Sequence, residues 1–313
     1  MKGGRKVKNW NYDFTVPDQK KVRMIVYTDC KNEADDQFAL AHHLMTPKFL
    51  VKGIVAGHFN GNPQEWGEGH TAEASYSEVH KVLKLMDVED QFKVYKGSEY
   101  PLTDSTEYQP SDACDFIIEE ALKDDPHPLY IACQGAITDL ASAILKEPKI
   151  CSRMTAIWIG GGQYPEGEKE FNLEMDIKAA NVVMRSKMPL WQIPMNVYKQ
   201  MAVTLAELQM HVKPCGEIGN YLFTQMVEFN TKAADFPWPH GEIWGLGDSP
   251  TVGVLLQESQ KRDVYDVIPA PVFKEDESYD FSEKNRDIRV YKQVDARMIL
   301  NDFYAKLYLN YHQ

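Results

Sequence analysis

The sequence lacks several features that mark particular classes of protein. No apolar run approaches the ~20 residues of a membrane-spanning helix, and the basic N-terminus is not followed by the apolar core of a secretory signal. Its five cysteines are an odd number without a CxxC pair, which favours free thiols over a disulfide scaffold or a zinc site. We therefore expect a cytoplasmic protein with no membrane segment.

Basic residues are fewer than acidic ones, 34 against 46, and the net charge is −12. This balance argues against a nucleic-acid-binding surface. A GxxxxGK[ST] phosphate loop is also missing, and the sequence TDCKN has no second acidic residue two positions after Asp29. A metal-dependent phosphohydrolase therefore finds little support.

Segments with strand-like and helix-like patterns alternate along the chain, without internal repeats or low-complexity stretches. The strand-like segments are 22–28, 50–57, 92–97, 128–133, 153–162 and 189–196, and the helix-like segments are 37–45, 70–86, 111–123, 138–147 and 177–186. This alternation predicts an α/β fold with a mainly parallel central sheet and helices on both faces.

The two ends of the chain depart from this alternation. Residues 1–20 are polar, and we expect a flexible arm there, followed by a single domain over 21–313 because no Pro- or Gly-rich linker divides the chain. Region 203–256 reads as mostly helical, interrupted by a loop over 235–250. A late strand over 287–295 and a closing helix over 298–309 complete a helical elaboration of the C-terminal third.

Polar residues follow the predicted strands at the points where the strands end. They are Asp29, Asn60, Gln134, the glycines 160–162 and Asn196. In open parallel α/β sheets, ligands bind beyond the carboxyl ends of the strands. We therefore expect these positions to meet at one edge of the sheet and to form a site.

Four acidic residues crowd the first of these strand ends: Asp29, Glu33, Asp35 and Asp36. A helix N-terminus stabilises each carboxylate by only ~0.3–1 kcal/mol, which is too little to offset their mutual repulsion. A bound divalent cation would offset this repulsion. A mixture of carboxylate and backbone carbonyl oxygens favours Ca²⁺ over Mg²⁺ or Zn²⁺. Plain capping of the following helix is the alternative.

The same stretch carries a family resemblance. DCKNEADD (29–36), followed by Ala39 and Leu40, resembles the Asp-x-x-x-Asp-Asp signature of the inosine-uridine-preferring nucleoside hydrolase family, lengthened by two residues. Four more segments are similar to family segments in the same order: VYKGSEYPL (94–102), IACQGAITDLASAI (131–144), IGGG with EFNLEMDIKAA (159–162 and 170–180), and GDSPTVG (247–253). The resemblance covers about residues 22 to 308 and implies a Rossmann-related nucleoside-hydrolase fold.

The resemblance implies a set of ligands for Ca²⁺ and for ribose. The cation would be held by Asp29, Asp36, the backbone carbonyl of Gln134, and Asp248. The ribose would be held by Asp35, by Asn60, by Glu170 and Asn172 near the 5′-hydroxyl, and less directly by Asn196. Each of these roles has a simpler structural alternative. Asn60 could be only a turn residue in FNGNP, Glu170 and Asn172 only solvated loop residues, and Asp248 only a helix cap.

The implied reaction is calcium-dependent hydrolysis of the N-glycosidic bond of ribonucleosides, releasing base and ribose. A metal-bound water would attack through an oxocarbenium-like state, with Asp29 as the general base. The family also implies a homodimer or a homotetramer. A non-catalytic calcium- or sugar-binding module on the same fold is the rival interpretation.

The sequence departs from the family pattern at two places. Gly247 stands where family members often have a histidine before the late aspartate, so His240 or Trp244 is the candidate to assist the leaving base, although a loop histidine is usually only solvent-exposed. The inserted turn Lys31-Asn32-Glu33 is the second departure, and Glu33 is a further candidate for substrate binding. An unusual N-riboside is therefore an alternative substrate.

Overall fold

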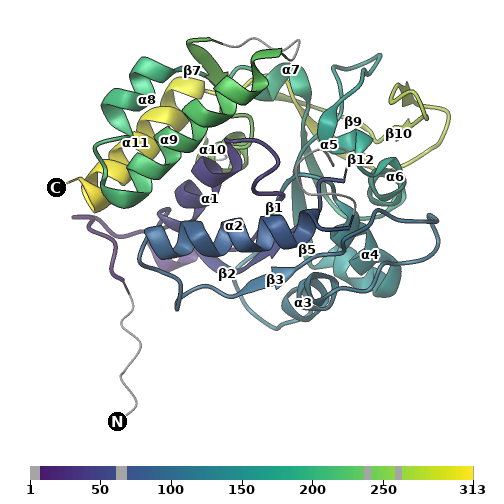
Figure 1. Cartoon of the computed structure of the whole chain (residues 1–313). Helices are drawn as coiled ribbons and strands as arrows, with labels where there is room; N and C mark the ends of the chain where they lie inside the picture. Colours follow the sequence, from purple (N-terminus) through teal and green to yellow (C-terminus); the bar gives the residue numbers. More distant parts are fainter. Residues whose placement is uncertain (1–7, 61–68, 236–240, 258–262, 313) are drawn as a thin grey trace.

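An eight-stranded sheet runs through the centre of the protein (Figure 1). The computed structural model describes residues 8–60, 69–235, 241–257 and 263–312. In spatial order the strands are β3 (Val94–Lys96), β2 (Phe49–Ala56), β1 (Val22–Thr28), β4 (Leu129–Gln134), β5 (Met154–Ile159), β6 (Leu190–Ile193), β12 (Asp287–Tyr291) and β9 (Tyr265–Pro269). All neighbours pair in parallel except β9, which is antiparallel to β12. The predicted mainly parallel sheet is confirmed.

Strand β1 lies at the centre of the sheet, and all seven of its residues are buried. Its side chains alternate between two hydrophobic cores: Met24 and Val26 belong to one, and Ile25 and Tyr27 to the other. A strand covered on both faces reads as a continuous apolar run, and this is why it was readable in the sequence.

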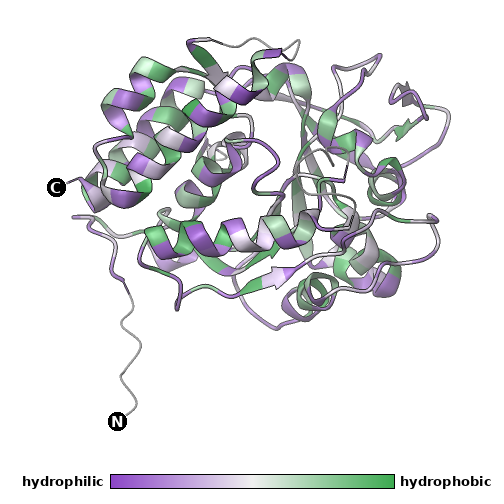
Figure 2. Ribbon diagram, viewed as in Figure 1, coloured by the Kyte–Doolittle hydropathy of each residue, from purple (hydrophilic) through white to green (hydrophobic). Residues whose placement is uncertain are grey.

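Helices cover both faces of the sheet, as predicted. One layer contains α1 (Asp36–Leu44), α2 (Thr71–Leu85), α8 (Leu205–His211), α9 (Gly216–Lys232), α10 (Pro250–Gln257) and α11 (Ala296–Tyr311), and the other contains α3 (Asp112–Ala121), α4 (Thr138–Lys146) and α6 (Ile177–Arg185). Figure 1 shows α8, α9 and α11 side by side, forming the helical elaboration. The helices in Figure 2 carry both hydrophobic and hydrophilic bands, as amphipathic helices do.

The structure shortens several predicted strands and adds short strands that were not predicted. The strands predicted over 153–162 and 287–295 end at Ile159 and Tyr291. The strand predicted over 189–196 ends at Ile193, because Pro194 cannot donate to a strand ladder and instead precedes α7 (Met195–Tyr198). Asn196 is therefore helical. Strands β7 (Ala202–Thr204) and β8 (Ile243–Gly245) pair with each other, and β10 (Val272–Phe273) pairs with β11 (Tyr279–Asp280). Two or three residues are too few to show a strand pattern in sequence.

The described part of the N-terminal segment contacts the last helix. The Trp10 ring meets Tyr311 edge to face at 6.4 Å, and the main-chain amide of Asn11 donates to Asn310 Oδ1 at 2.7 Å. The Tyr12 hydroxyl donates to the carbonyl of Met45 at 2.6 Å. These contacts attach residues 10–12 to the body, whereas residues 1–7 of the predicted arm lie outside the described residues.

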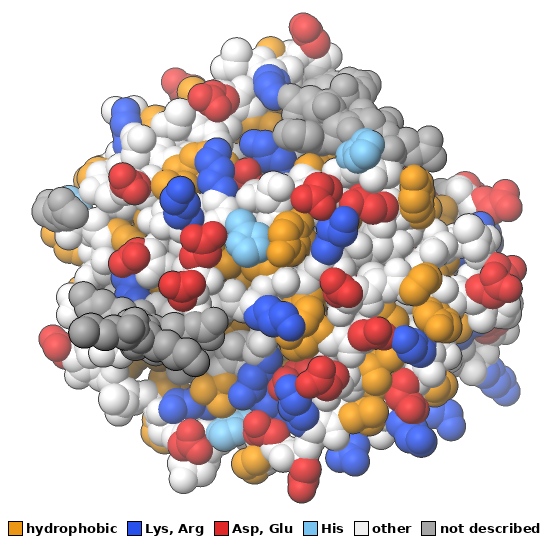
Figure 3. Space-filling view, turned by 60° about the horizontal axis from the view of Figure 1, so that its bottom comes forward, with side chains coloured by type: hydrophobic (Ala, Val, Ile, Leu, Met, Phe, Trp, Pro, Cys, Tyr) orange, Lys and Arg blue, Asp and Glu red, His pale blue; other side chains and the backbone are white. Residues whose placement is uncertain are grey.

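The surface mixes charges of both signs. On the face drawn in Figure 3, acidic and basic side chains are interspersed. Among the described helices, none combines the length and the apolar character that a bilayer span requires. All five cysteines are buried and free.

Candidate active site

The candidate site lies at the carboxyl ends of β1 and β4, which are neighbours in the sheet. The chain runs from β1 to β2 on one side and reaches β4 on the other, so this is the point where the strand order reverses. Asp29 follows β1, and Gln134 is the last residue of β4. A Cβ placed on Gly135 would lie only 2.7 Å from Cγ of Asp29, so the glycine permits Asp29 to pack over the end of β4.

The inserted residues form a tight turn between β1 and α1. Lys31 has a φ of 94°, and the amide of Asn32 donates to the carbonyl of Asp29 at 3.0 Å. Lys31 extends toward Glu78, with Nζ 3.9 Å from its carboxylate. Among the described residues, no ion pair joins a basic side chain to the aspartates of this loop.

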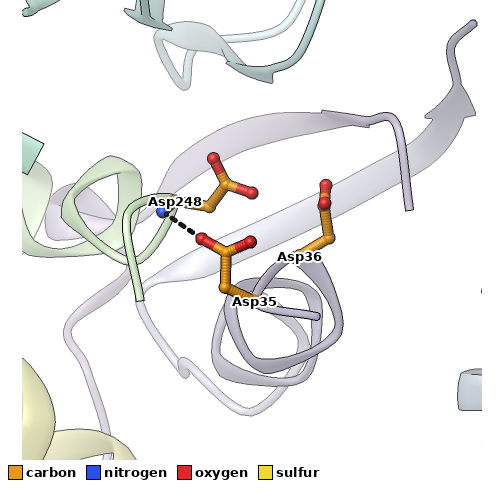
Figure 4. Close-up of side chains that lie close together, drawn as sticks. All are labelled: Asp35, Asp36 and Asp248. Atoms are coloured by element: carbon orange, nitrogen blue, oxygen red, sulfur yellow. Dashed lines mark hydrogen bonds between the residues drawn. The ribbon is translucent and has the colours of Figure 1, made fainter. Parts of the chain in front are cut away.

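Asp35 occupies the N-cap position of α1, but its side chain makes no capping hydrogen bond. Its Oδ2 instead accepts a hydrogen bond from the main-chain amide of Asp248 at 3.2 Å (Figure 4). Asp36, the first residue of α1, accepts a hydrogen bond from the Thr28 hydroxyl. Plain capping therefore does not account for either carboxylate.

Three aspartates converge at this point: Asp35, Asp36 and Asp248. Each has a carboxylate oxygen within 4.8 Å of one on each of the others, and all three residues are buried. Figure 4 shows the carboxylates of α1 and of the segment before α10 gathered around a common space. Asp29, a predicted ligand, is not one of these three, but Asp36 and Asp35 lie close enough to raise its pKa.

Burial and mutual repulsion make these groups hard to ionise in the cation-free cluster. Burial, reinforced by Asp35, raises the pKa of Asp36 to about 7. Burial and the two neighbouring aspartates raise the pKa of Glu33 to about 8, and burial raises the pKa of Asp35 to about 6. The pKa values of Asp29 and Asp248 lie well above the usual range for the same reasons.

The donor set fits a hard divalent cation. Besides the aspartates, two buried amide oxygens accept no hydrogen bond, Oδ1 of Asn32 and Oε1 of Gln134. The nitrogens of the same side chains are engaged, with Asp29 at 3.3 Å and with the Thr251 hydroxyl at 2.8 Å. Carboxylate and amide oxygens are the ligands that Ca²⁺ prefers.

A cavity of about 560 Å³ adjoins the aspartates. Its walls contain Glu33, Asp35, Lys169, Glu170, Phe171, Glu174, Met195, Tyr198, Lys199, Ala202, Ile243, Trp244, Gly245 and Gly247. The ring of Trp244 also packs edge to face against Phe229 at 5.5 Å. Phe171 and Tyr198 were missed by the sequence analysis, although Tyr198 comes soon after a strand end.

Glu170 and Asn172 are held by the loop that they belong to. The carboxylate of Glu170 caps the short helix α5 (Phe171–Glu174) and also accepts from the Gly161 amide at 2.8 Å and the Tyr198 hydroxyl at 2.9 Å. The amide nitrogen of Asn172 donates to the carbonyl of Ile159 at 2.9 Å. Glu170 nevertheless lines the cavity, so it is not a solvated loop residue.

Three residues predicted to bind the ribose do not line this cavity, and Asn172 is one of them. Asn60 is half-buried, donates to the carbonyl of Glu99, and accepts from the Thr71 hydroxyl at 2.9 Å. Asn196 is exposed on α7 and lines a separate cavity with Tyr164 and Lys292. His240 lies outside the described residues.

The chain is similar in sequence to known proteins. A profile of the family described as inosine-uridine preferring nucleoside hydrolase matches residues 24–301. The chain is 21% identical over 242 residues to the pyrimidine-specific ribonucleoside hydrolase RihA of Salmonella arizonae, covering 72% of this chain and 75% of the relative.

Solved structures share the fold. A purine-preferring ribonucleoside hydrolase from Gardnerella vaginalis superposes with a TM-score of 0.69 at 20% identity, covering 91% of this chain and 98% of that one. An inosine-guanosine nucleoside hydrolase gives a TM-score of 0.71 at 17% identity, with the same coverage. The chain therefore belongs to the inosine-uridine preferring nucleoside hydrolase family, whose members are ribonucleoside-hydrolysing glycosidases.

Proposed function

We propose that the protein hydrolyses the N-glycosidic bond of ribonucleosides with the help of a bound Ca²⁺. The observation that carries this proposal is the convergence of Asp35, Asp36 and Asp248 within 4.8 Å, from segments far apart in the chain. Burying several carboxylates without a counter-charge is costly. Family membership supplies the reaction, and the cluster supplies the reason for the cation.

Four groups would hold the cation: Asp29, Asp36, the main-chain oxygen of Gln134, and Asp248. A bound Ca²⁺ would orient the ribose diol and lower the pKa of a coordinated water. The mixture of carboxylate and amide oxygens favours Ca²⁺, because Mg²⁺ requires stricter octahedral geometry.

Asp29 is the proposed general base. It is buried beside Gly135, where it would accept a proton from the water that attacks the anomeric carbon. Asp35 lies on the cavity wall and would bind the ribose hydroxyls and stabilise the positive charge that grows on the sugar. Glu33 and Glu170 line the same cavity, and with Asn172 they would position the rest of the ribose.

Trp244 and His240 are the proposed residues on the leaving-group side. Trp244 lines the cavity and offers a ring for the base to stack on. His240 would protonate the base, a role that rests on the sequence alone.

The test is incubation of the protein with inosine, uridine and adenosine in Ca²⁺, followed by an assay for reducing sugar. We expect release of ribose that a chelator abolishes and added Ca²⁺ restores. Calcium binding without ribose release from any N-riboside would instead indicate the rival interpretation, a non-catalytic binding module.

Two further properties complete the proposal. We expect a homodimer or a homotetramer, which light scattering on the purified protein would measure. We also expect the protein to work in the reducing cytoplasm, since its five cysteines are free, and fractionation of cells would check this.

A further inference from the structure

The cavity combines aromatic rings with an excess of carboxylates. The rings belong to Phe171, Tyr198 and Trp244, the carboxylates to Glu33, Asp35, Glu170 and Glu174, and the basic groups to Lys169 and Lys199. Both lysines are exposed. Aromatic faces and carboxylates both attract cations, and aromatic cages are a common way to bind a cationic ring or a quaternary nitrogen.

Residue 247, directly before Asp248, provides no proton donor. It is a glycine, and a Cβ placed on it would lie 3.1 Å from Cδ2 of Tyr198 and 3.5 Å from Oδ2 of Asp35. The Tyr198 ring therefore occupies the space into which a longer side chain at this position would extend. Its hydroxyl is engaged with Glu170 at 2.9 Å.

The other described side chains of the cavity offer few proton donors, and Glu33, whose pKa is about 8, belongs to the aspartate loop. They include no histidine, the side chain best suited to donate a proton near neutral pH. Burial and the Glu170 carboxylate raise the pKa of Tyr198 well above its usual range, so the phenol holds its proton tightly. Apart from Glu33, the described residues of the wall are better suited to attract positive charge than to deliver a proton.

This composition bears on which bases can leave. A neutral base departs with the electron pair of the broken C–N bond and needs a proton to avoid becoming an anion. A base that is already cationic takes the same pair and becomes neutral. Such a substrate needs no acid, and the ring that leaves is the one that the aromatic and acidic walls attract.

Building on the hydrolase function proposed above, we infer that the preferred substrates are N-ribosides whose leaving group is a flat, permanently cationic heteroaromatic ring, the N-ribosylpyridinium class. In the reaction, the C–N bond breaks and its electron pair neutralises the ring nitrogen. Water adds its oxygen to the anomeric carbon, and Asp29 accepts the proton. The products are ribose and a neutral pyridine.

The first test compares kcat/KM for the N-riboside of nicotinamide with kcat/KM for inosine and uridine, using the full chain in Ca²⁺. We expect the cationic substrate to be favoured roughly tenfold, the size of effect that a cation–aromatic site supports. Equal or better use of inosine or uridine would overturn this inference and leave the proposed function standing. Hydrolysis of none of the three would overturn both.

The second test changes the wall. Glu174 is exposed and lines the cavity, so Glu174→Gln should lower kcat/KM for the cationic substrate about threefold more than kcat/KM for inosine, as expected for one exposed charge. Glu107→Gln, which removes an exposed carboxylate that does not line the cavity, is the control and should change neither substrate.

The aromatic wall has its own matched pair. Tyr198→Phe keeps the ring and should retain the preference, whereas Tyr198→Leu should reduce it severalfold. If Glu174→Gln or Tyr198→Leu lowered kcat/KM for both substrates equally, the walls would not select for charge and the inference would be wrong.

Discussion

The hydroxyl of Tyr198 donates a 2.9 Å hydrogen bond to Oε1 of Glu170. This bond joins α7 to the start of α5, two segments that meet at the wall of the cavity. The same carboxylate accepts from the amides of Gly161, Asn172 and Leu173. Glu170 therefore holds the wall of the cavity together through these hydrogen bonds, in addition to any contact with the substrate.

Glu170→Gln should be costly for stability as well as for activity. The new amide group would face N–H donors, leaving buried polar atoms unpaired, and we expect the free energy of unfolding to fall by about 1–3 kcal/mol. Denaturant titration measures this loss. The exposed neighbour Glu166, changed to Gln, is the control and should be neutral. An unaltered stability in Glu170→Gln would show that the four hydrogen bonds are not needed.

Asp36→Asn should separate cation binding from folding. Removing a ligand should weaken Ca²⁺ binding at least ~100-fold and abolish ribose release. The metal-free variant should nevertheless unfold at a higher temperature than the metal-free wild type, because one repelling charge is gone. Calorimetry with and without Ca²⁺ measures both effects, and Asp112→Asn, at an exposed position of α3, is the matched control. A variant that still bound Ca²⁺ tightly would remove Asp36 from the ligand set.

The metal-free protein should lose stability as pH rises. The pKa of Asp36 goes from an ordinary 3.8 to about 7 in the folded state. Between these values the folded state holds a proton that the unfolded state has released, so the free energy of unfolding falls with increasing pH across this window. Added Ca²⁺ competes with that proton, and its stabilising effect should therefore grow over the same range.

Thermal unfolding at about pH 5 and about pH 8, with and without Ca²⁺, checks this dependence. Asp36→Asn serves as the reference, because it keeps all other titrating groups. The unfolding temperatures of the wild type and the variant should differ most at the higher pH. The same slope in both proteins would contradict the assignment of the effect to Asp36.

His240→Ala should affect substrates unequally. If His240 donates the proton to the leaving base, kcat for inosine falls by about 100-fold or more. The N-riboside of nicotinamide needs no such proton and should be hydrolysed at an unchanged rate. An unchanged kcat for inosine would exclude His240 as the acid.

The sheet was readable in the sequence because its central strands are buried on both sides. The run 22–28 is mostly apolar, with Arg23 as its charged residue, and most helices that follow such runs have an amphipathic pattern. Strand boundaries were harder to predict, as Pro194 illustrates. The apolar pattern continues past Pro194, but the strand ends before it because proline has no N–H to donate to a neighbouring strand.

The candidate site was readable only in part. Asp29, Asp35 and Asp36 stand out because they are neighbours in sequence and follow a strand. Asp248 has no local signal that connects it to them, and only the family resemblance pointed to it. Phe171 and Tyr198 went unnoticed because sequence does not show which side of a loop or a short helix meets a cavity.

Asp35 and Asp248 are in contact although 213 positions separate them. During synthesis, the crowded carboxylates after β1 emerge from the ribosome long before the residue that completes their cluster. A nascent or truncated chain that ends before α10 has the crowded carboxylates after β1 but lacks Asp248, so its cation site is incomplete. Occupancy of the proposed cation site would thus report that the chain has been completed and folded, and calcium affinity would then be a sensitive measure of full-length folding.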